Sequence, residues 1–274
     1  MTTAKDIRVA PVMRAAADAC IKRHHYSGKV LNNSTLHFGI FLDGIMHGAL
    51  QFGPSLDKRK IQPLVKDTNW NGFIELNRMA CGPELPRNSE SRALAIAFRL
   101  IRKQYPHIEW VISFADGTQC GDGTIYRASG FVLTGINQNT QIVEFPDGLR
   151  ESRIVLTDTR RPRRIEVAQR YGAKIGGSAS LIPFLNVGAK VLPGFQLRYI
   201  YFLNPEARNR LTVPVLPFSA IDAAGAGMYL GNPRLKQAIS STPTERGCNA
   251  HPDALSNTGE ISVNHSVYGE TGCD

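Results

Sequence analysis

Several side chains that could bind a substrate or move a proton follow predicted strands of this chain. Asp116 comes directly after Trp110–Phe114, an apolar run typical of a buried strand. Open α/β sheets bind ligands at the carboxyl ends of their strands, so Asp116 could contact a bound ligand there. Tyr126 lies further along, in a short helix, where it could simply pack against Phe131.

A second polar group lies at the predicted start of a helix. Asn88 or Ser89 can cap this helix, and Glu90 falls in its first turn, where a carboxylate complements the helix dipole. The unpaired N–H groups of a helix start attract anions, and Arg87 adds a positive charge beside them. The sequence therefore predicts an anion site at Arg87, Asn88 and Ser89, with Ser91 in the first turn of the helix.

The elements that position these residues form one ordered stretch, residues 72–131. Alternation of apolar and polar residues predicts a strand over Phe73–Met79, in which Glu75 and Arg78 point to opposite faces and Arg78 shares a face with Leu76. An amphipathic helix, a buried strand, a polar loop and a short helix ending near Gly130 follow.

Flanking segments extend the predicted sheet. Asp43-Gly44 between two apolar runs predicts a hairpin of residues 36–42 and 45–52. Residues 131–134 and 141–145 are predicted to form another strand pair, and Gln196–Leu203 a late strand of the same sheet. Residues 5–23 are predicted to be one amphipathic helix, which ends at His25-Tyr26. Such a pair could bind a metal or donate to a carbonyl, although similar surface clusters commonly have no role.

Taken together, these motifs suggest a family. The runs Glu75–Arg78, Leu85–Glu90, Ser113–Asp116 and Tyr126–Ser129, with the pair His25-Tyr26 upstream, resemble the Mom family of phage DNA-modification proteins. The resemblance covers roughly residues 20 to 135 and includes several motifs in the same order, whereas each motif alone would be weak. It implies a fold related to the acyl-CoA-dependent N-acetyltransferase (GNAT) fold. That is an α/β (α+β) domain with a central mixed, mostly antiparallel sheet flanked by helices.

The resemblance also implies an activity and a set of site residues. The activity is transfer of a carbamoylmethyl (acetamido-type) group to N6 of adenine in DNA, which shields the DNA from restriction endonucleases. The donor would be acetyl-CoA or a related acyl donor, although residues 85–91 lack the glycine-bearing loop with which GNAT proteins usually hold coenzyme A. Iron bound by His25, Tyr26 and Asp116 is a minority hypothesis. The catalytic residues implied are His25, Tyr26, Arg78, Ser91, Asp116 and Tyr126. The resemblance implies that Asp116 orients or deprotonates the adenine amine, and that Tyr126 acts as a general acid or contacts a carbonyl group.

Composition sets broader limits on the class of protein. With 274 residues, 42% hydrophobic and 20% charged, the chain is long enough for one large domain and has the composition of an ordinary globular protein. It has no apolar run of about 20 residues and no signal pattern, so we expect no membrane association and a location in the bacterial host's cytoplasm. Five cysteines without paired metal-type spacing argue against a disulfide framework or a zinc site.

The net charge of +9 favours a polyanionic partner. Residues 150–174 carry eight basic and three acidic side chains, most densely at Arg160-Arg161-Pro162-Arg163-Arg164. We interpret Arg160, Arg161, Arg163 and Arg164 as contacts to the phosphates of double-stranded DNA, the alternative being a solvated linker.

The predicted organisation is a catalytic domain at 1–206 with a basic insertion at about 150–174, an irregular extension at 207–239 and a disordered tail at 240–274. Two other functions stay open. One is an acetyl-CoA-dependent N-acetyltransferase acting on a small molecule or a protein, and the other is a non-catalytic DNA-binding protein on a GNAT scaffold. The oligomeric state is also open, a dimer included.

Overall fold

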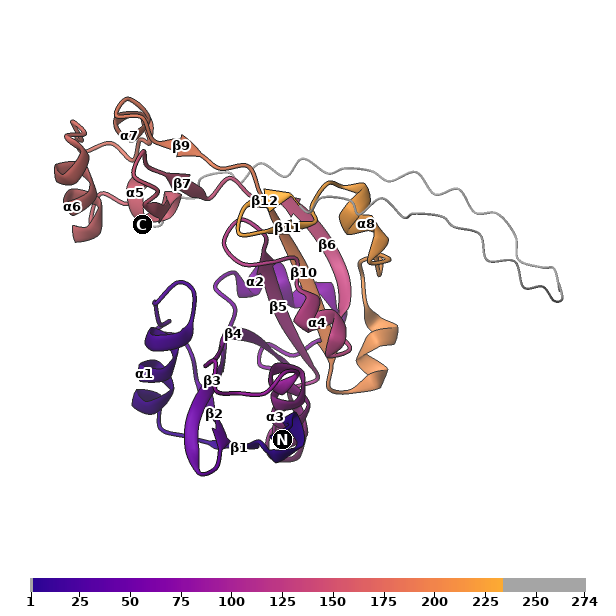
Figure 1. The fold of residues 1–274 in the computed structure, drawn as a ribbon. Helices are drawn as coiled ribbons and strands as arrows, with labels where there is room; N and C mark the ends of the chain where they lie inside the picture. The colour runs from indigo at the N-terminus through magenta and orange to yellow at the C-terminus, as the bar shows by residue number, and fades with distance from the viewer. Residues whose placement is uncertain (1, 234–274) are drawn as a thin grey trace, which may run out of the picture. The chain divides into compact units, whose positions relative to one another are not determined.

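A seven-stranded mixed sheet forms the centre of the protein. The computed structural model describes residues 2–233, and the predicted disordered tail at 240–274 lies outside them. The strand order is β1-β2-β3-β4-β5-β10-β6, and every neighbouring pair is antiparallel except β4 and β5. This confirms the predicted class, a mixed, mostly antiparallel sheet flanked by helices (Figure 1). The strands are Arg8–Pro11 (β1), Leu36–Leu42 (β2), Ile45–Gly53 (β3), Phe73–Cys81 (β4), Trp110–Asp116 (β5), Phe195–Phe202 (β10) and Val132–Gln138 (β6).

Two helices cover opposite faces of this sheet. Helix α1 (Arg14–His24) buries Ala17, Cys20 and Ile21 against Ala49 of β3 and Ala80 of β4. Helix α3 (Ser89–Gln104) packs on the other face, where its predicted apolar stripe is buried. Figure 1 shows α1 and α3 on either side of β1–β4. Helix α3 connects β4 to β5 directly, whereas α1 follows β1 and packs on β3 and β4.

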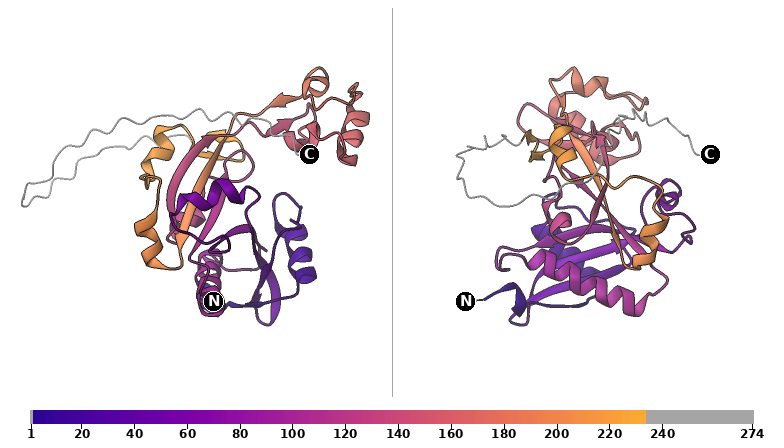
Figure 2. Two further views of the ribbon diagram at one scale, coloured as in Figure 1. Left: turned by 180° about the vertical axis from the view of Figure 1, so that it is seen from behind. Right: turned by 90° about the vertical axis from the view of Figure 1, so that its right-hand side faces the viewer.

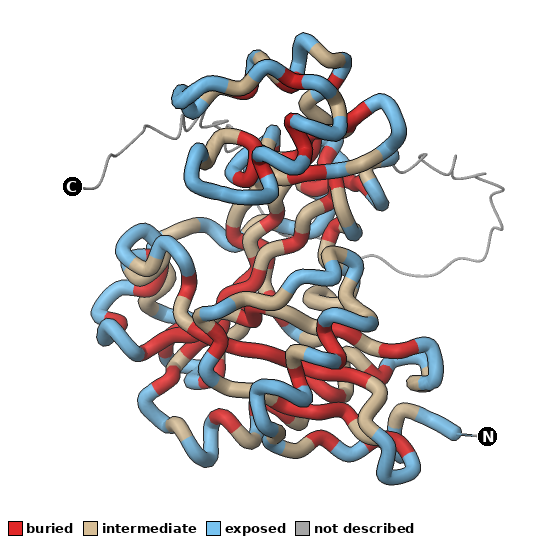
Figure 3. Tube along the Cα trace, turned by 90° about the vertical axis from the view of Figure 1, so that its left-hand side faces the viewer, coloured by how far each residue is buried: buried red, intermediate tan, exposed pale blue. Residues whose placement is uncertain are grey.

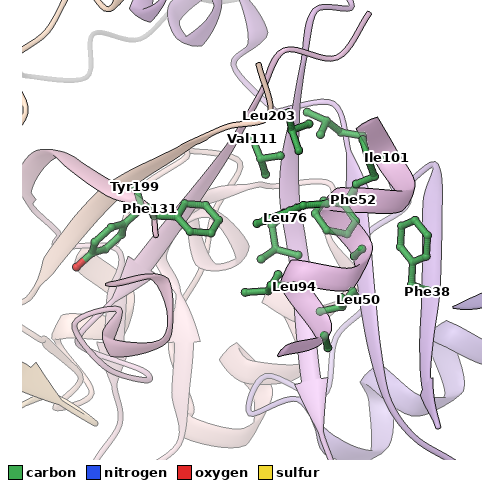
Figure 4. Close-up of a cluster of buried hydrophobic side chains, with 14 of the residues drawn as sticks. Phe38, Leu50, Phe52, Leu76, Leu94, Ile101, Val111, Phe131, Tyr199 and Leu203 are labelled. Atoms are coloured by element: carbon green, nitrogen blue, oxygen red, sulfur yellow. The ribbon is translucent and has the colours of Figure 1, made fainter. Parts of the chain in front are cut away.

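The larger core lies under α3. Leu94 and Ile101 of the helix face Leu50, Phe52 and Leu76 of the sheet (Figure 4). The same cluster continues through Val111 to Phe131 and Tyr199, so it joins both halves of the sheet. Figure 3 shows buried residues following the strands, while the connecting loops are mostly exposed. The core therefore holds the two parallel strands β4 and β5 on a rigid support.

A small module is inserted in the chain between β6 and β10, which are neighbours in the main sheet. It contains β7 (Ile142–Glu144), β8 (Arg150–Ser152) and β9 (Lys190–Val191) in a separate three-stranded sheet, with α5 (Arg153–Thr157), α6 (Pro162–Tyr171) and α7 (Ile182–Leu185). Its own core includes Val143, Leu156 and Phe184. Both views of Figure 2 show these elements gathered beside the main sheet. The arginine-rich segment 150–174 lies within this module.

The remaining elements are short. They are η1 (Ala4–Asp6), α2 (Lys58–Ile61), η2 (Gln62–Leu64), α4 (Thr124–Ala128), η3 (Pro205–Arg210), α8 (Ser219–Ala223), β11 (Met228–Tyr229) and β12 (Asn232–Pro233). Within residues 2–233, no helix combines the length and apolar character needed to cross a bilayer.

The hairpin prediction is confirmed, and two other predictions are wrong. Asp43 and Gly44 have φ angles of 50° and 81°, the positive values that a type I′ turn requires. Residues 5–23 are not one helix, because Arg8–Pro11 pairs with β2 as an edge strand, where a proline is tolerated. Strands β6 and β7 do not pair with each other; β6 pairs with β10, and β7 belongs to the small module.

We predict that Gly53→Ala destabilises the protein. A Cβ at Gly53 would overlap the Asn33 carbonyl oxygen and lie 2.5 Å from Asn77 Oδ1. Backbone atoms cannot move aside cheaply, so the free energy of unfolding should fall by about 1–3 kcal/mol in urea titrations. Gly177→Ala is the matched control, because no atom lies within 4 Å of its Cβ position. Equal effects of the two substitutions would contradict this account of the close packing at Gly53.

Candidate active site where two parallel strands part

The parallel strands β4 and β5 separate after three residue pairs. Phe73–Glu75 pairs with Trp110–Ile112, and beyond these residues β4 pairs with β3 and β5 with β10. Ser113 Oγ spans the first step of the opening with a long hydrogen bond, 3.5 Å, to the Leu76 carbonyl oxygen. The facing backbone edges past this point no longer pair with each other, so their N–H and C=O groups need other partners.

A β-bulge at Asn77 determines which side chains face this opening. Gln51 of β3 pairs with Arg78, and the next residue, Phe52, pairs with Leu76, so Asn77 is the extra residue. The bulge reverses the alternation of faces. Arg78 therefore lies on the face of Glu75, and the prediction that it shares a face with Leu76 is wrong. Its neighbour Met79 packs into the core under α3.

Arg78 is the electrostatic centre of the site. Its Nε donates to the Lys29 carbonyl oxygen at 3.2 Å, and its Nη1 donates to the Asn77 carbonyl oxygen at 2.8 Å. The charge of Arg78 adds to the decrease in the pKa of His25 and opposes the increases that burial causes in the pKa values of Tyr26, Glu75 and Tyr126. Four groups from three separate segments of the chain therefore lie within electrostatic reach of one cation.

His25 is held neutral at the end of α1. Burial, and secondly the charge of Arg78, lower the pKa of His25 to about 4. Its Nδ1 lies 3.2 Å from the Ser27 backbone nitrogen, which donates to it, and 2.8 Å from Ser27 Oγ. Because Nδ1 accepts a hydrogen bond, the proton of the neutral ring is assigned to Nε2. His25 can thus donate a hydrogen bond at neutral pH without carrying a charge.

Two tyrosines contribute protonated hydroxyl groups. Burial raises the pKa of Tyr26 to about 12, with Arg78 opposing the shift and Cys120, Asp116 and Tyr126 adding to it. The residue is 54% exposed, so this burial concerns the hydroxyl end, whereas part of the ring reaches solvent beside His25. Burial also raises the pKa of Tyr126, although a hydrogen bond with Ser113 acts to lower it. The ring of Tyr126 also packs on Phe131 and Tyr199. A packing role for this ring is therefore compatible with a chemical role for its hydroxyl group.

Glu75 is a site residue that the sequence analysis did not identify as one. Burial raises the pKa of Glu75, while hydrogen bonds with Ser55 and Asn77 and the charge of Arg78 oppose the rise. The Asn77 side chain is almost fully buried, and no hydrogen-bond partner of its Oδ1 is found among the described residues. Only the bulge, which sequence alternation does not reveal, turns Arg78 towards Glu75.

Asp116 lies at the end of β5, as predicted. Its Oδ1 accepts from the Thr118 backbone nitrogen at 2.9 Å and its Oδ2 from Gln119 Nε2 at 3.1 Å. These bonds fix the carboxylate at the start of the loop that also holds the exposed thiol of Cys120. Asp116 is close enough to Tyr26 to raise its pKa, so the structure brings His25, Tyr26, Arg78, Asp116 and Tyr126 into one cluster.

The start of α3 forms a separate group. Arg87 and Asn88 are exposed, and Asn88 adopts a left-handed conformation with φ of 70°. Ser89 is fully buried and its hydroxyl donates to the Pro86 carbonyl oxygen at 2.6 Å, so this hydroxyl does not face a ligand. Ser91 Oγ donates to the Asn88 carbonyl oxygen at 3.1 Å. Helix α3 contacts α4, which carries Tyr126. The residues at the start of α3 and Tyr126 therefore both lie on the α3 side of the opening.

The four predicted DNA-contact arginines divide into two kinds. The Arg160 side chain is 90% exposed and Arg161 is 48% exposed, and both pair with Asp158. Arg163 pairs with Glu151 and Glu166. Arg164 must be removed from the set, because it is buried and donates to the carbonyl oxygens of three residues: Leu156, Gly176 and Ser178. Its charge stabilises the fold of the module.

The metal hypothesis does not fit this arrangement. Within residues 2–233, no group of three or more His, Cys, Asp or Glu side chains could hold a metal ion. His25 Nδ1 and both Asp116 oxygens already take part in hydrogen bonds within the protein. We therefore assign no metal ligand and derive no chemical step from a metal.

The protein has a mixed α/β sheet with a cluster of polar side chains at the parting of two parallel strands. The chain belongs to the Mom protein family, whose model matches residues 6–220. It is 37% identical over 209 residues to Methylcarbamoylase mom of Escherichia phage Mu, covering 76% of this chain and 80% of that protein. The resemblance to the Mom family that the sequence suggested is therefore confirmed.

Solved structures with a similar course of the chain are acetyltransferases. The ribosomal-protein-S18-alanine N-acetyltransferase from Escherichia coli is 11% identical with a TM-score of 0.39, over 72% of this chain and 94% of that one. An N-acetyltransferase from Staphylococcus aureus Mu50 is 9% identical with a TM-score of 0.40, over 72% of this chain and 99% of that one.

We predict that Arg78→Met raises the pKa of His25 from about 4 towards its ordinary value, because the charge of Arg78 is one cause of the decrease. The unfolded chain protonates His25 near pH 6.5, so the stability that the neutral ring contributes is complete above that pH. It is lost as the pH falls towards 4. Ring chemical shifts followed by NMR across pH measure the titration. Arg99→Met on the exposed side of α3 is the control. A His25 that titrates near 6.5 in the unaltered protein would contradict the assignment.

Proposed function

We propose that this protein transfers a carbamoylmethyl-type group to N6 of adenine in double-stranded DNA and so protects the DNA from restriction endonucleases. The observation that carries the proposal is the cluster at the parting of β4 and β5, where Arg78 lies within electrostatic reach of His25, Tyr26, Glu75 and Tyr126. Membership of the Mom family and the name of the phage Mu relative support the same reaction.

The chemistry requires activation of a poor nucleophile. The lone pair of the adenine amine is conjugated with the ring, so the enzyme must accept a proton as the new N–C bond forms. In our proposal, Asp116, fixed by its bonds to Thr118 and Gln119, orients the amine. Glu75, whose raised pKa makes it a stronger base than an ordinary carboxylate, accepts the proton.

The leaving group takes the electron pair of the bond that breaks and needs a proton and a compensating charge. Tyr126 is protonated at neutral pH because burial raises its pKa, and it can donate that proton. Arg78 stabilises the negative charge that develops, and the Nε2–H of His25 is available to polarise a carbonyl oxygen, as is the hydroxyl of Tyr26.

The donor in this proposal is acetyl-CoA or a related acyl donor, bound on the α3 side of the opening. Acyl transfer from acetyl-CoA itself would leave an acetyl group on N6. A carbamoylmethyl product therefore requires a related donor that carries the amide nitrogen and a leaving group on its methylene carbon, from which that group departs with its bonding electrons. Arg87 and the N–H groups at the start of α3 would hold its phosphates, and Ser91 lies in the same first turn. Glu90 opposes this binding, and a glycine-bearing loop is absent at residues 85–91. Arg87 therefore carries most of the expected attraction for the phosphates.

The DNA would lie on the arginine-rich module. Arg160 and Arg161 are exposed, and Arg163 is 44% exposed, so all three can reach phosphates. The adenine N6 amine faces the major groove, but its access to a site between two strands requires that the base leaves the stack. Phage DNA in the bacterial cytoplasm is the proposed substrate.

Nucleosides from a host that expresses this protein test the function. We expect mass spectrometry to detect a heavier deoxyadenosine, whose mass also reports the group transferred. Asp116→Ala, Glu75→Gln and Tyr126→Phe should each lower its yield by roughly 10²–10⁴-fold, the range for loss of a general acid or base. Glu206→Gln, in η3, is the control that should leave the yield unchanged.

Each alternative predicts a different result. Unmodified DNA together with acetyl transfer to polyamines or peptides would replace the proposal by an ordinary acetyltransferase. Salt-sensitive DNA binding without any product would indicate a non-catalytic DNA-binding protein. Full modification by both Asp116→Ala and Glu75→Gln would contradict the roles assigned to these two carboxylates.

Salt titrations of binding test the DNA surface. The double variant Arg160→Ala, Arg161→Ala should weaken duplex binding, and the slope of log K against log salt should become shallower by roughly 2, about 0.9 for each lost phosphate contact. Fluorescence anisotropy with a labelled duplex measures both quantities. The control is Arg102→Ala, Lys103→Ala in the last turn of α3. An unchanged slope in the arginine variant would remove these residues from the interface.

A further inference from the structure

A continuous series of polar contacts links the arginine-rich module to Arg78. Arg163 Nε donates to Glu151 Oε1 at 2.7 Å, and Lys29 Nζ lies 3.4 Å from Glu151 Oε2. The carbonyl oxygen of the same Lys29 accepts from Arg78 Nε at 3.2 Å. Every step is a hydrogen bond or ion pair between residues far apart in the sequence. A predicted DNA contact and the centre of the active site are thus joined through two intermediate residues.

Glu151 is the buried member of this series. Its side chain is 3% exposed, whereas those of Lys29 and Arg163 are 62% and 44% exposed. A buried carboxylate needs charged or hydrogen-bonding partners, because removal of a partner leaves an uncompensated charge. Each of its two oxygens has one cationic partner, so the strength of one pair depends on the other.

The loop that contains Lys29 also carries two active-site residues. His25 ends α1, and a tight turn returns the chain through a hydrogen bond of 2.8 Å from Gly28 N to the His25 carbonyl oxygen. Gly28 has φ of 58°, which the turn requires and which glycine adopts without strain. Because the turn is short, a shift of Lys29 moves His25 and Tyr26 as well as the acceptor of Arg78.

We propose that Lys29 and Glu151 are positioning residues through which the binding of a DNA phosphate at Arg163 orders Arg78 and the His25–Tyr26 turn for catalysis. The inference rests on the proposed function. Arg163 has two acidic partners, Glu151 and Glu166, and a phosphate competes with both for its guanidinium. When Arg163 turns to the phosphate, Glu151 keeps Lys29 as its cationic partner and holds the loop more tightly. DNA is then both the substrate and the signal that completes the site.

The chain offers a matched pair of variants to test this role. Glu151→Gln and Glu166→Gln each remove one acidic partner of Arg163, but only Glu151 contacts Lys29. Lys29→Met removes the other partner of the Lys29–Glu151 ion pair, and Lys29→Arg preserves the positive charge at this position. The yield of modified deoxyadenosine per folded protein is measured in the host. Duplex affinity and melting temperature are measured on the purified full chain.

We expect Glu151→Gln and Lys29→Met to lower the yield by about 10–100-fold, the effect of a small misplacement of catalytic groups. Duplex affinity should stay within about twofold of the unaltered protein, as for a loss of positioning without loss of binding. Glu166→Gln and Lys29→Arg should keep the yield. The double variant Lys29→Met, Glu151→Gln should be no worse than either single variant, because both remove the same link.

Three results would overturn the inference. They are a full yield from Lys29→Met, equal yields from Glu151→Gln and Glu166→Gln, and a loss explained entirely by weaker DNA binding or by a fall in melting temperature. Absence of modified nucleoside in the unaltered protein would instead refute the proposed function. The two failures are therefore distinguishable in one set of measurements.

Discussion

The parting of β4 and β5 is the constraint on which the rest of the structure depends. Two adjacent parallel strands normally pair along their length, and separation leaves backbone groups without their neighbour. Here each strand keeps a partner on its outer side, β3 for β4 and β10 for β5, so the sheet stays intact around the opening. The core under α3 spans both halves of the sheet and prevents the opening from collapsing. The separation of β4 and β5 that forms the candidate site is thus maintained by packing in the core under α3.

The opening also sets the electrostatics of the site. A carboxylate, an imidazole and two phenols lie around one guanidinium in a partly buried site, where charges interact more strongly than on the open surface. Burial disfavours the charged form of each group, so His25 and both tyrosines are neutral. Arg78 is thereby left as the dominant positive charge beside Glu75. Such a site suits a reaction in which a neutral amine and a neutral donor pass through a charged transition state.

Local patterns predicted the elements of this fold, and non-local pairing decided where the predictions failed. The Asp43-Gly44 hairpin, the stripe of α3 and the buried strand before Asp116 depend on neighbouring residues, and all three are confirmed. The partner of β6 is β10, which follows the whole small module, and no local signal specifies that pairing. The bulge at Asn77 is a shift of one residue, yet it reverses the face of Arg78. Glu75 could be recognised as its partner only after that shift was known.

The arginine-rich segment illustrates the same limit for charge. Its formal excess of basic residues suggested one DNA-binding stretch, but the fold uses these residues in different ways. Arg164 binds carbonyl oxygens inside the module, Arg150 and Arg170 pair with Glu144 and Asp147, and Arg163 is shared between two acids. A guanidinium is available to a phosphate only when it is exposed and its acidic partners can be displaced. Arg160 meets this condition most fully and Arg164 not at all. Arg163 is intermediate in its availability to a phosphate. If it exchanges Glu151 for a phosphate, the contact between Glu151 and Lys29 is affected inside the protein. Such a coupling is expected of a residue that transmits DNA binding to the proposed active site.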